Sequence, residues 1–214
     1  MIKYTRNSNL FENIDTEQKA YWIGFIAADG YVNQERKSID IQLHSKDLEH
    51  LKKFQNFLQT DAPVKEIKDR EAVRFQIYDE KLTKDLEYWG LVPRKSHTLE
   101  FPKKMSREIQ KHFIRGLFDG DGSIYKHSQK TERGKGIYYS YRLEITGTKE
   151  VLQGVQSYFN GVGRIRFHKR AYRWEVNKKK EVETILKELY INNSIALERK
   201  NKLALEAIII NQKS

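Results

Sequence analysis

The chain has 214 residues, 38% of them hydrophobic and 12% aromatic, which excludes intrinsic disorder and is enough for one large domain or two small ones. It has no cysteine, which excludes a disulfide framework and cysteine-ligated metal. No apolar run approaches the ~20 residues of a membrane span, so a membrane-spanning helix is not expected. Forty Lys and Arg against 29 Asp and Glu give a formal charge of +11. This charge indicates either a protein that binds a polyanionic partner or a basic protein without one. We expect a soluble, intracellular protein, whether in bacterial cytoplasm, in phage-infected cytoplasm or in an organelle.

The first half of the chain predicts a helix, strands and two further helices. Residues 17–29 form an apolar helix that Asp15 or Thr16 can cap and that ends at Gly30 in the C′ position, where helices often turn left-handed. In residues 38–44 apolar and polar side chains alternate, which is typical of a strand with one buried face. The other predicted elements are a helix at 46–58, a hairpin at 64–79 and a helix at 80–90.

The second half predicts the same order of elements. A helix opens at Ser106, runs through residues 107–121 and ends at Gly122. The elements after it are an alternating strand at 138–146, a helix at 149–159, a hairpin at 163–177, a helix at 180–190 and a C-terminal helix at 201–210. We therefore predict an α+β fold of two αββαββα repeats, each with a four-stranded antiparallel sheet covered by helices on one face. The predicted repeats are residues 1–92 and 106–214, and the linker is the proline-containing segment 93–105.

Two of these helices end on the same motif, a glycine followed after four residues by Asp-Gly. The copies, 92 residues apart, are Gly24, Asp29, Gly30 and Gly116, Asp121, Gly122. Gly24 and Ala28 lie four residues apart, as do Gly116 and Gly120, so each helix presents a small-residue face that another helix can approach closely. We expect the two helices to pack together around a pseudo-twofold axis.

This packing would bring Asp29 and Asp121 together at two helix C-termini, where the helix dipoles already disfavour a negative charge. Two such carboxylates repel, so one must be protonated or a cation must lie between them. Oxygen ligands indicate Mg²⁺ or another hard divalent cation. The alternative is that each Asp-Gly pair only forms the turn into the next strand, but its repetition on two small-residue helix faces favours the metal site.

One face of each predicted sheet carries polar and basic side chains. Most of the excess charge lies in residues 106–214, with 22 basic against 12 acidic residues, and residues 161–180 hold eight basic residues against Glu175 alone. A plain solvated face would mix in more acids, so this pattern favours nucleic acid, whose phosphates require the charge and whose bases pair with Arg, Gln, His and Asn. The candidate contacts are Asp40, Gln42, His44, Arg74, Gln76, Tyr78, Tyr138, Ser140, Arg142, Glu144, Arg164, Arg166, His168, Arg170, Arg173, Glu175 and Asn177.

The segments WIGFIAADG (22–30) and IRGLFDGDG (114–122) resemble the two signature helices of the LAGLIDADG homing endonucleases, in the single-chain form with two repeats. The resemblance spans nearly the whole chain, because the flanking strands and helices recur in order in both halves. It implies a monomer whose two saddle-shaped sheets lie across the major groove of a long, weakly palindromic DNA site. The signature helices would then meet above the minor groove at the centre of that site.

The resemblance also implies how the DNA is cut. Asp29 and Asp121 would bind divalent metal with help from the backbone carbonyls of Ala28 and Gly120. The expected ion is Mg²⁺, with Mn²⁺ or another hard cation as a substitute and Ca²⁺ in a complex that does not cleave. Both DNA strands would be hydrolysed to leave short 3′ overhangs. One aspartate would be needed for the cleavage of each strand, which explains why the motif occurs twice.

Further site residues follow from the resemblance alone. A catalytic basic residue near each centre matches Lys95 and Lys200, with Arg94 and Arg199 as adjacent choices. A polar residue at the end of the second strand would be His44 or Ser45 in the first half, and Thr146 or Gly147 in the second. The difference between these polar residues predicts unequal support for the two cleavage reactions. The first acid of the motif is Ala27 in one copy and Asp119 in the other, but this position is not the metal ligand, so its loss in one copy does not predict a loss of activity.

Two other functions remain open on the same fold. One is an RNA-binding maturase that assists intron splicing, with intron RNA as its partner. The other is a sequence-specific DNA-binding protein that has lost cleavage. Retention of both Asp29 and Asp121 argues against the second alternative, because a protein that only binds gains nothing from paired acids beside phosphate.

Overall fold

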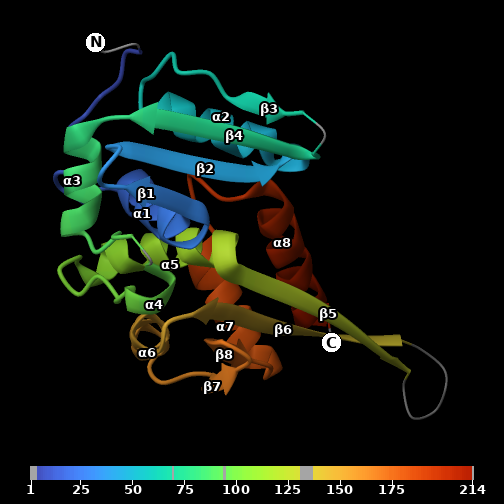
Figure 1. Ribbon diagram of the computed structural model, residues 1–214. Coiled ribbons are helices and arrows are strands. Elements are labelled where there is room, and N and C mark those ends of the chain that lie inside the picture. Colours follow the sequence, from blue (N-terminus) through green and yellow to red (C-terminus); the bar gives the residue numbers. More distant parts are fainter. Residues whose placement is uncertain (1–3, 69, 94, 131–136, 214) are drawn as a thin grey trace.

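The computed structural model describes residues 4–68, 70–93, 95–130 and 137–213 (Figure 1). It contains two four-stranded antiparallel sheets, with strand orders β1-β2-β4-β3 and β5-β6-β8-β7. Each sheet follows one signature helix, and the order of helices and strands in the two halves is the same. The predicted α+β fold of two αββαββα repeats is therefore confirmed.

The elements of the first half agree closely with their predicted positions. They are α1 (Glu17–Asp29), β1 (Gly30–Asn33), β2 (Ser38–His44), the short helix η1 (Ser45–Asp47), α2 (Leu48–Phe57), β3 (Lys65–Ile67), β4 (Ala72–Tyr78) and α3 (Glu80–Tyr88). The Thr16 hydroxyl caps α1 by accepting a hydrogen bond from Lys19 N at 3.4 Å. The four-residue helix α4 (Lys95–Thr98) lies between this half and the next.

The second half has the same elements and one long helix more. They are α5 (Arg107–Asp121), β5 (Gly122–Lys130), β6 (Ile137–Gly147), α6 (Lys149–Tyr158), β7 (Arg164–His168), β8 (Ala171–Val176), α7 (Lys179–Tyr190) and α8 (Glu198–Lys213). In Figure 1 the two sheets lie on opposite sides of the α1 and α5 pair. None of the helices, over the part of the chain that the structure describes, is long and apolar enough to cross a membrane.

Backbone contact between α1 and α5 joins the two halves. A β-carbon on Gly24 would lie 2.9 Å from Leu117 N, and one on Gly116 would lie 2.8 Å from Phe25 N, closer than real β-carbons approach. Only glycine lets the two backbones come this near, so the small-residue faces expected from the sequence are the interface. The last turns of the two helices consequently lie side by side.

Gly30 and Gly122 correct one expectation from the sequence. Both adopt extended backbone, with φ −83° and −90°, and each begins a strand instead of turning left-handed. Each N–H still donates to the preceding helix, at Ile26 O and Phe118 O. Glycine is needed for space, because a β-carbon at Gly30 would lie 2.8 Å from Ile26 O.

Each sheet buries one face beneath helices and leaves the other polar. In β2 the buried face carries Ile39, Ile41 and Leu43, and in β8 it carries Trp174 and Val176. Helices α2 and α3 contact the first sheet, whereas α6, α7 and α8 contact the second. The opposite faces carry most of the polar side chains of the strands, such as Asp40 and Gln76 in the first sheet and Arg142 and Arg173 in the second.

Candidate active site

Asp29 and Asp121 end α1 and α5, and the close helix packing brings their carboxyl groups together. Asp29 Oδ2 lies 3.3 Å from the position that a β-carbon on Gly120 would occupy, one residue before Asp121. Both aspartates are at the surface, although neighbouring backbone excludes much of the water around their carboxyl groups. The structure thus places Asp29 and Asp121, which come from opposite halves of the chain, close together.

Burial raises the pKa values of both acids, and the pKa of Asp121 also responds to the nearby charge of Asp29. Burial, and after it the negative charge of Asp29, raise the pKa of Asp121 from 3.8 to about 6, against the opposing charges of Lys95 and Lys200. Burial also raises the pKa of Asp29, and Lys200, Lys95 and Arg199 oppose that rise. Each carboxylate is therefore held in an environment where added positive charge is favourable.

Lys95 and Lys200 reach the two helix ends in matching ways. Lys95 Nζ donates to Ala27 O at 2.7 Å and to Ala28 O at 3.2 Å, at the end of α1. Lys200 Nζ donates to Phe118 O at 2.7 Å and Gly120 O at 3.2 Å, and also to the carbonyls of Asp119 and Gly122. An ammonium on the last carbonyls of a helix neutralises the negative end of its dipole.

The two lysines differ in burial. Lys200 is only 6% exposed, and burial lowers its pKa from 10.5 to about 8, although Asp119, Asp29 and Asp121 favour its charged form. Burial also lowers the pKa of Lys95, against the charges of Asp121 and Asp29. The ammonium group of Lys200 is thus held in place within the protein by its hydrogen bonds to backbone carbonyls.

The donor set at the helix ends fits a hard divalent cation. It consists of two carboxylates, whose ionised forms added positive charge would stabilise, and of the carbonyls of Ala28 and Gly120, which here accept hydrogen bonds from Lys95 and Lys200 at 3.2 Å. Across residues 4–68, 70–93, 95–130 and 137–213, no three His, Asp or Glu residues cluster as a metal site. Any cation held here would therefore need further oxygen ligands beyond the two aspartates, such as water or a phosphate.

The positions beside the carboxylates differ from those expected in the first half. The register pairs Gly30 with Ile41 and Gly122 with Ile145, so Gln42 in β2 is the equivalent of Thr146 in β6, each one residue beyond the partner of the glycine that follows the aspartate. Thr146 agrees with the expectation, whereas His44 lies two residues too far along the strand. His44 instead accepts a hydrogen bond from Lys46 N at 3.1 Å and faces Glu71.

The adjacent basic choices have other surroundings. Arg199 Nε lies 3.2 Å from Asp47 Oδ2, an ion pair that links α8 to the first half. Arg94 lies outside the residues that the structure describes.

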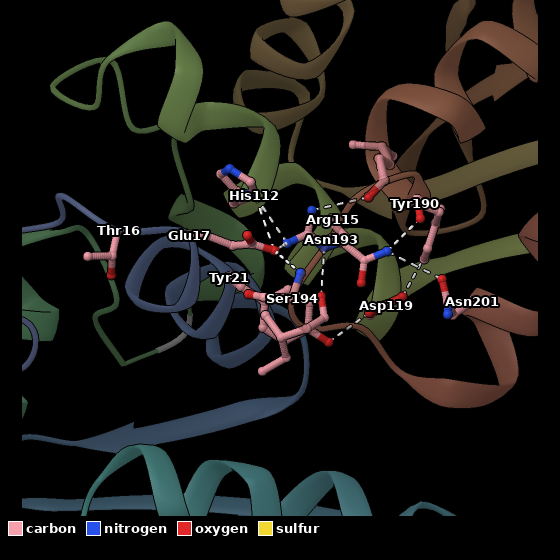
Figure 2. A network of polar contacts seen from close by, with 12 residues as sticks. Thr16, Glu17, Tyr21, His112, Arg115, Asp119, Tyr190, Asn193, Ser194 and Asn201 are labelled. Atoms are coloured by element: carbon pink, nitrogen blue, oxygen red, sulfur yellow. Dashed lines mark hydrogen bonds and ion pairs between the residues drawn. The ribbon is translucent and has the colours of Figure 1, made fainter.

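Asp119, the extra acid of the second motif, lies in a buried network that the sequence did not reveal (Figure 2). Its carboxylate accepts hydrogen bonds from Tyr21 OH at 2.7 Å, Tyr190 OH at 2.6 Å and Leu197 N at 2.6 Å. Leu197 directly precedes α8, whose first turn carries Lys200. Asp119 therefore anchors the segment that positions Lys200, and Ala27 offers no equivalent anchor in the first half.

A second polar cluster holds the same segment (Figure 2). Arg115 is 1% exposed and its Nη2 lies 2.6 Å from Glu17 Oε1, which joins α5 to α1. Ser194 N donates to the same oxygen at 2.7 Å, and Arg115 Nε donates to Ile195 O at 2.8 Å. The two halves and the approach to α8 are thus fixed relative to one another.

The candidate contacts of the first sheet lie on its polar face. The register aligns Asp40 with Gln76 and Gln42 with Arg74 across β2 and β4. Arg74 Nε lies 2.9 Å from Asp40 Oδ1, and Gln76 donates to the same carboxylate at 3.1 Å. Tyr78 is 55% exposed at the strand end, so this face presents aromatic and amide groups around a neutralised acid.

The second sheet presents most of the arginines. Its register aligns Arg166 with Arg173 and Arg164 with Glu175, on the same face as Arg142. Glu144 is buried between Arg142 and Arg173, at 2.9 Å and 3.2 Å, so its carboxylate is committed to the arginines. The other candidates in this half have these positions: Ser140 on the same face of β6, His168 at the end of β7, Arg170 in the β7–β8 turn and Asn177 after β8.

The side chain of Tyr138 lies outside the described residues, although its backbone is in β6. Polar residues of β1 and β5 that lie on the same faces are absent from the predicted contacts; they are Tyr31, Asn33, Ser123, Tyr125 and His127. Their alternation with Val32 and Ile124 is the signal that would have found them.

Comparisons with known proteins match both halves of the chain to LAGLIDADG families. Residues 16–83 match a family described as LAGLIDADG-like domain, and residues 114–209 match one described as LAGLIDADG endonuclease. The replication factor C small subunit of Methanocaldococcus jannaschii is 29% identical over 126 residues, 56% of this chain. That match spans only 7% of the relative's own length.

Several solved meganuclease structures share the fold. A single-substitution variant of I-SmaMI has a TM-score of 0.67 at 17% identity, over 91% of this chain and 92% of that chain. I-LtrWI bound to target DNA has a TM-score of 0.66 at 13% identity, over 96% and 91% of the two chains. I-AabMI bound to uncleaved DNA has a TM-score of 0.63 at 16% identity, over 90% of each.

Proposed function

Since the chain belongs to the LAGLIDADG homing endonuclease family, as a single-chain member with two signature motifs, we propose that it cuts both strands of a specific DNA site. The observation that carries this proposal is the convergence of Asp29 and Asp121 at adjacent helix ends, between two polar sheet faces. We further propose that the chain acts as a monomer on a long, pseudo-palindromic duplex, and leaves short 3′ overhangs. We also propose that residues 1–92 form the first repeat, residues 93–105 the linker and residues 106–214 the second repeat.

Asp29 and Asp121 would hold the divalent cation, with the carbonyls of Ala28 and Gly120 beside them. When bound, a cation such as Mg²⁺ supplies positive charge that activates water and stabilises the departing oxygen of the phosphodiester. The acids themselves are suited to this role near neutral pH, because a pKa of about 6 leaves Asp121 mostly ionised at pH 7.

The two lysines would act from behind the acids. Because Lys200 is buried on four carbonyls, it serves to fix the end of α5 and to add positive charge beside the reacting phosphate. Lys95 does the same at the end of α1. The Arg-rich face of the second sheet would bind phosphates and base edges, which sets the register of the DNA over the acids.

A selection followed by cleavage tests this function. Duplexes with about 30 random base pairs are enriched for binding in Ca²⁺, and the enriched sequence is cloned into a plasmid and incubated with Mg²⁺. We expect double-strand cleavage by the wild type, and binding without cleavage by Asp29→Asn combined with Asp121→Asn. Binding without cleavage by the wild type in Mg²⁺ would leave only a DNA-binding protein, and enrichment from a parallel pool of random RNA, but not of duplex DNA, would favour the maturase.

A further inference from the structure

The hairpins that follow the two signature helices differ in length. Strands β1 and β2 pair at four positions, from Gly30 with Ile41 to Asn33 with Ser38. Strands β5 and β6 pair at nine positions, and their first pair, Gly122 with Ile145, is equivalent to the first pair of the other hairpin. The second hairpin therefore continues for five pairs beyond the end of the first, or roughly 17 Å at the usual rise per strand residue.

In the longer part of the second hairpin, side chains still alternate between the polar face and the helix-covered face of the sheet. His127 pairs with Ser140, two positions beyond the pair formed by Tyr125 and Arg142, so all four side chains share the polar face. His127 is exposed and Ser140 half-buried. Hydrogen-bonding groups consequently continue along this face, past the point where the first hairpin ends.

Helix α8 supports the extension from the other face. Glu206 accepts a hydrogen bond from Lys126 Nζ at 2.6 Å and from Tyr141 OH at 3.4 Å. Lys126 also lies 4.4 Å from the centre of the Tyr139 ring. An isolated two-stranded hairpin is marginal in water, so this backing is what lets the extension hold its shape.

Among the described residues of the first half, no long helix occupies the place in the chain that α8 occupies in the second. There α3 is followed by the four-residue helix α4, whereas α7 is followed by the sixteen-residue helix α8. Figure 1 shows α8 running beside the β5 and β6 hairpin, which projects from the body of the protein. The longer hairpin and the longer helix are thus paired features of one half.

We propose that the distal β5–β6 hairpin contacts the DNA major groove through His127 and Ser140, so that the target has unequal half-sites. This inference rests on the proposed function. A two-stranded ribbon fits the major groove of duplex DNA. The extension also continues the sheet face that carries Arg142, and this positive charge favours DNA over an uncharged partner. With about 3.4 Å per base pair, the added length corresponds to about five base pairs on the side bound by the second half.

The test compares target sites selected by variants of the full chain. Duplexes with about 30 random base pairs are enriched in Ca²⁺ by the wild type, by His127→Ala combined with Ser140→Ala, and by Ser128→Ala as a control. Ser128 is exposed, next to His127 in the strand, and points to the opposite face. A further variant replaces residues 126–141 with residues 34–37, which gives the second hairpin the length of the first.

We expect the wild-type site to extend about five base pairs farther from its centre on one side. The double alanine variant should lose base preference at those outer positions alone, by about tenfold, and Ser128→Ala should lose none. Equal half-sites, or an unchanged site for the double variant, would overturn this inference and leave the proposed function intact. Failure of the wild type to enrich any duplex would overturn both.

Discussion

Substitution of Gly116 by alanine tests the helix contact on which the site depends. The new β-carbon would lie 2.8 Å from Phe25 N and closer still to Tyr21 O, both of them backbone atoms that cannot rotate away. Overpacking of this kind costs about 3 kcal/mol, and alanine recovers about 1 kcal/mol through helix propensity. We therefore expect a net loss of about 2 kcal/mol in the free energy of unfolding.

That loss corresponds to a fall of about 4–8 °C in Tm for a protein of this size, measurable by circular dichroism. Gln18→Ala is the matched control, because Gln18 is exposed on α1, and its Tm should change by less than about 2 °C. If Gly116→Ala were as stable as the wild type, the two helix backbones would not be in contact. The convergence of the two acids would then lose its structural basis.

Three further outcomes are expected. Arg115→Met leaves the Glu17 carboxylate without its buried partner and should destabilise the protein by about 3 kcal/mol in urea denaturation, whereas a loss below 1 kcal/mol would show that the pair is dispensable. Burial lowers the pKa of His50 from 6.5 to about 3, so the unfolded chain binds the proton first and stability should fall by about 1.4 kcal/mol per pH unit as the pH falls from 6.5 to about 3. In His50→Gln this slope should be smaller, and an identical slope would assign the effect to other groups. Asp119→Asn should loosen the segment before Lys200 and slow cleavage of one DNA strand more than the other, which strand-specific labelling would detect; equal slowing would argue against this positioning role.

Much of the fold could be predicted because it depends on local periodicity. The alternation in residues 38–44 and the helical spacing of residues 17–29 gave the bounds of β2 and α1 as the structure has them. The expected C′ position of Gly30 was wrong, because Gly30 is the C-cap of α1 and continues directly into β1 with extended backbone.

The site could be predicted only in part, since it joins distant segments. Repetition of the motif pointed to Asp29 and Asp121, but their proximity depends on α1 packing against α5. The partners of Asp119 come from α1, from the end of α7 and from the segment before α8, and no sequence spacing relates them. The burial of Lys200 likewise follows from the position of α8, which the sequence indicated only as a helix.

The pH titration of the Asp121 carboxyl group, followed by ¹³C NMR, tests the central arrangement most directly. The midpoint in the free protein should lie near pH 6, above the usual 3.8, and should fall in Asp29→Asn, because the neighbouring negative charge is removed while the burial remains. Addition of Ca²⁺ should also lower it, since the cation stabilises the ionised form. A midpoint near 3.8 that neither Asp29→Asn nor Ca²⁺ changes would contradict a shared site formed by the two acids.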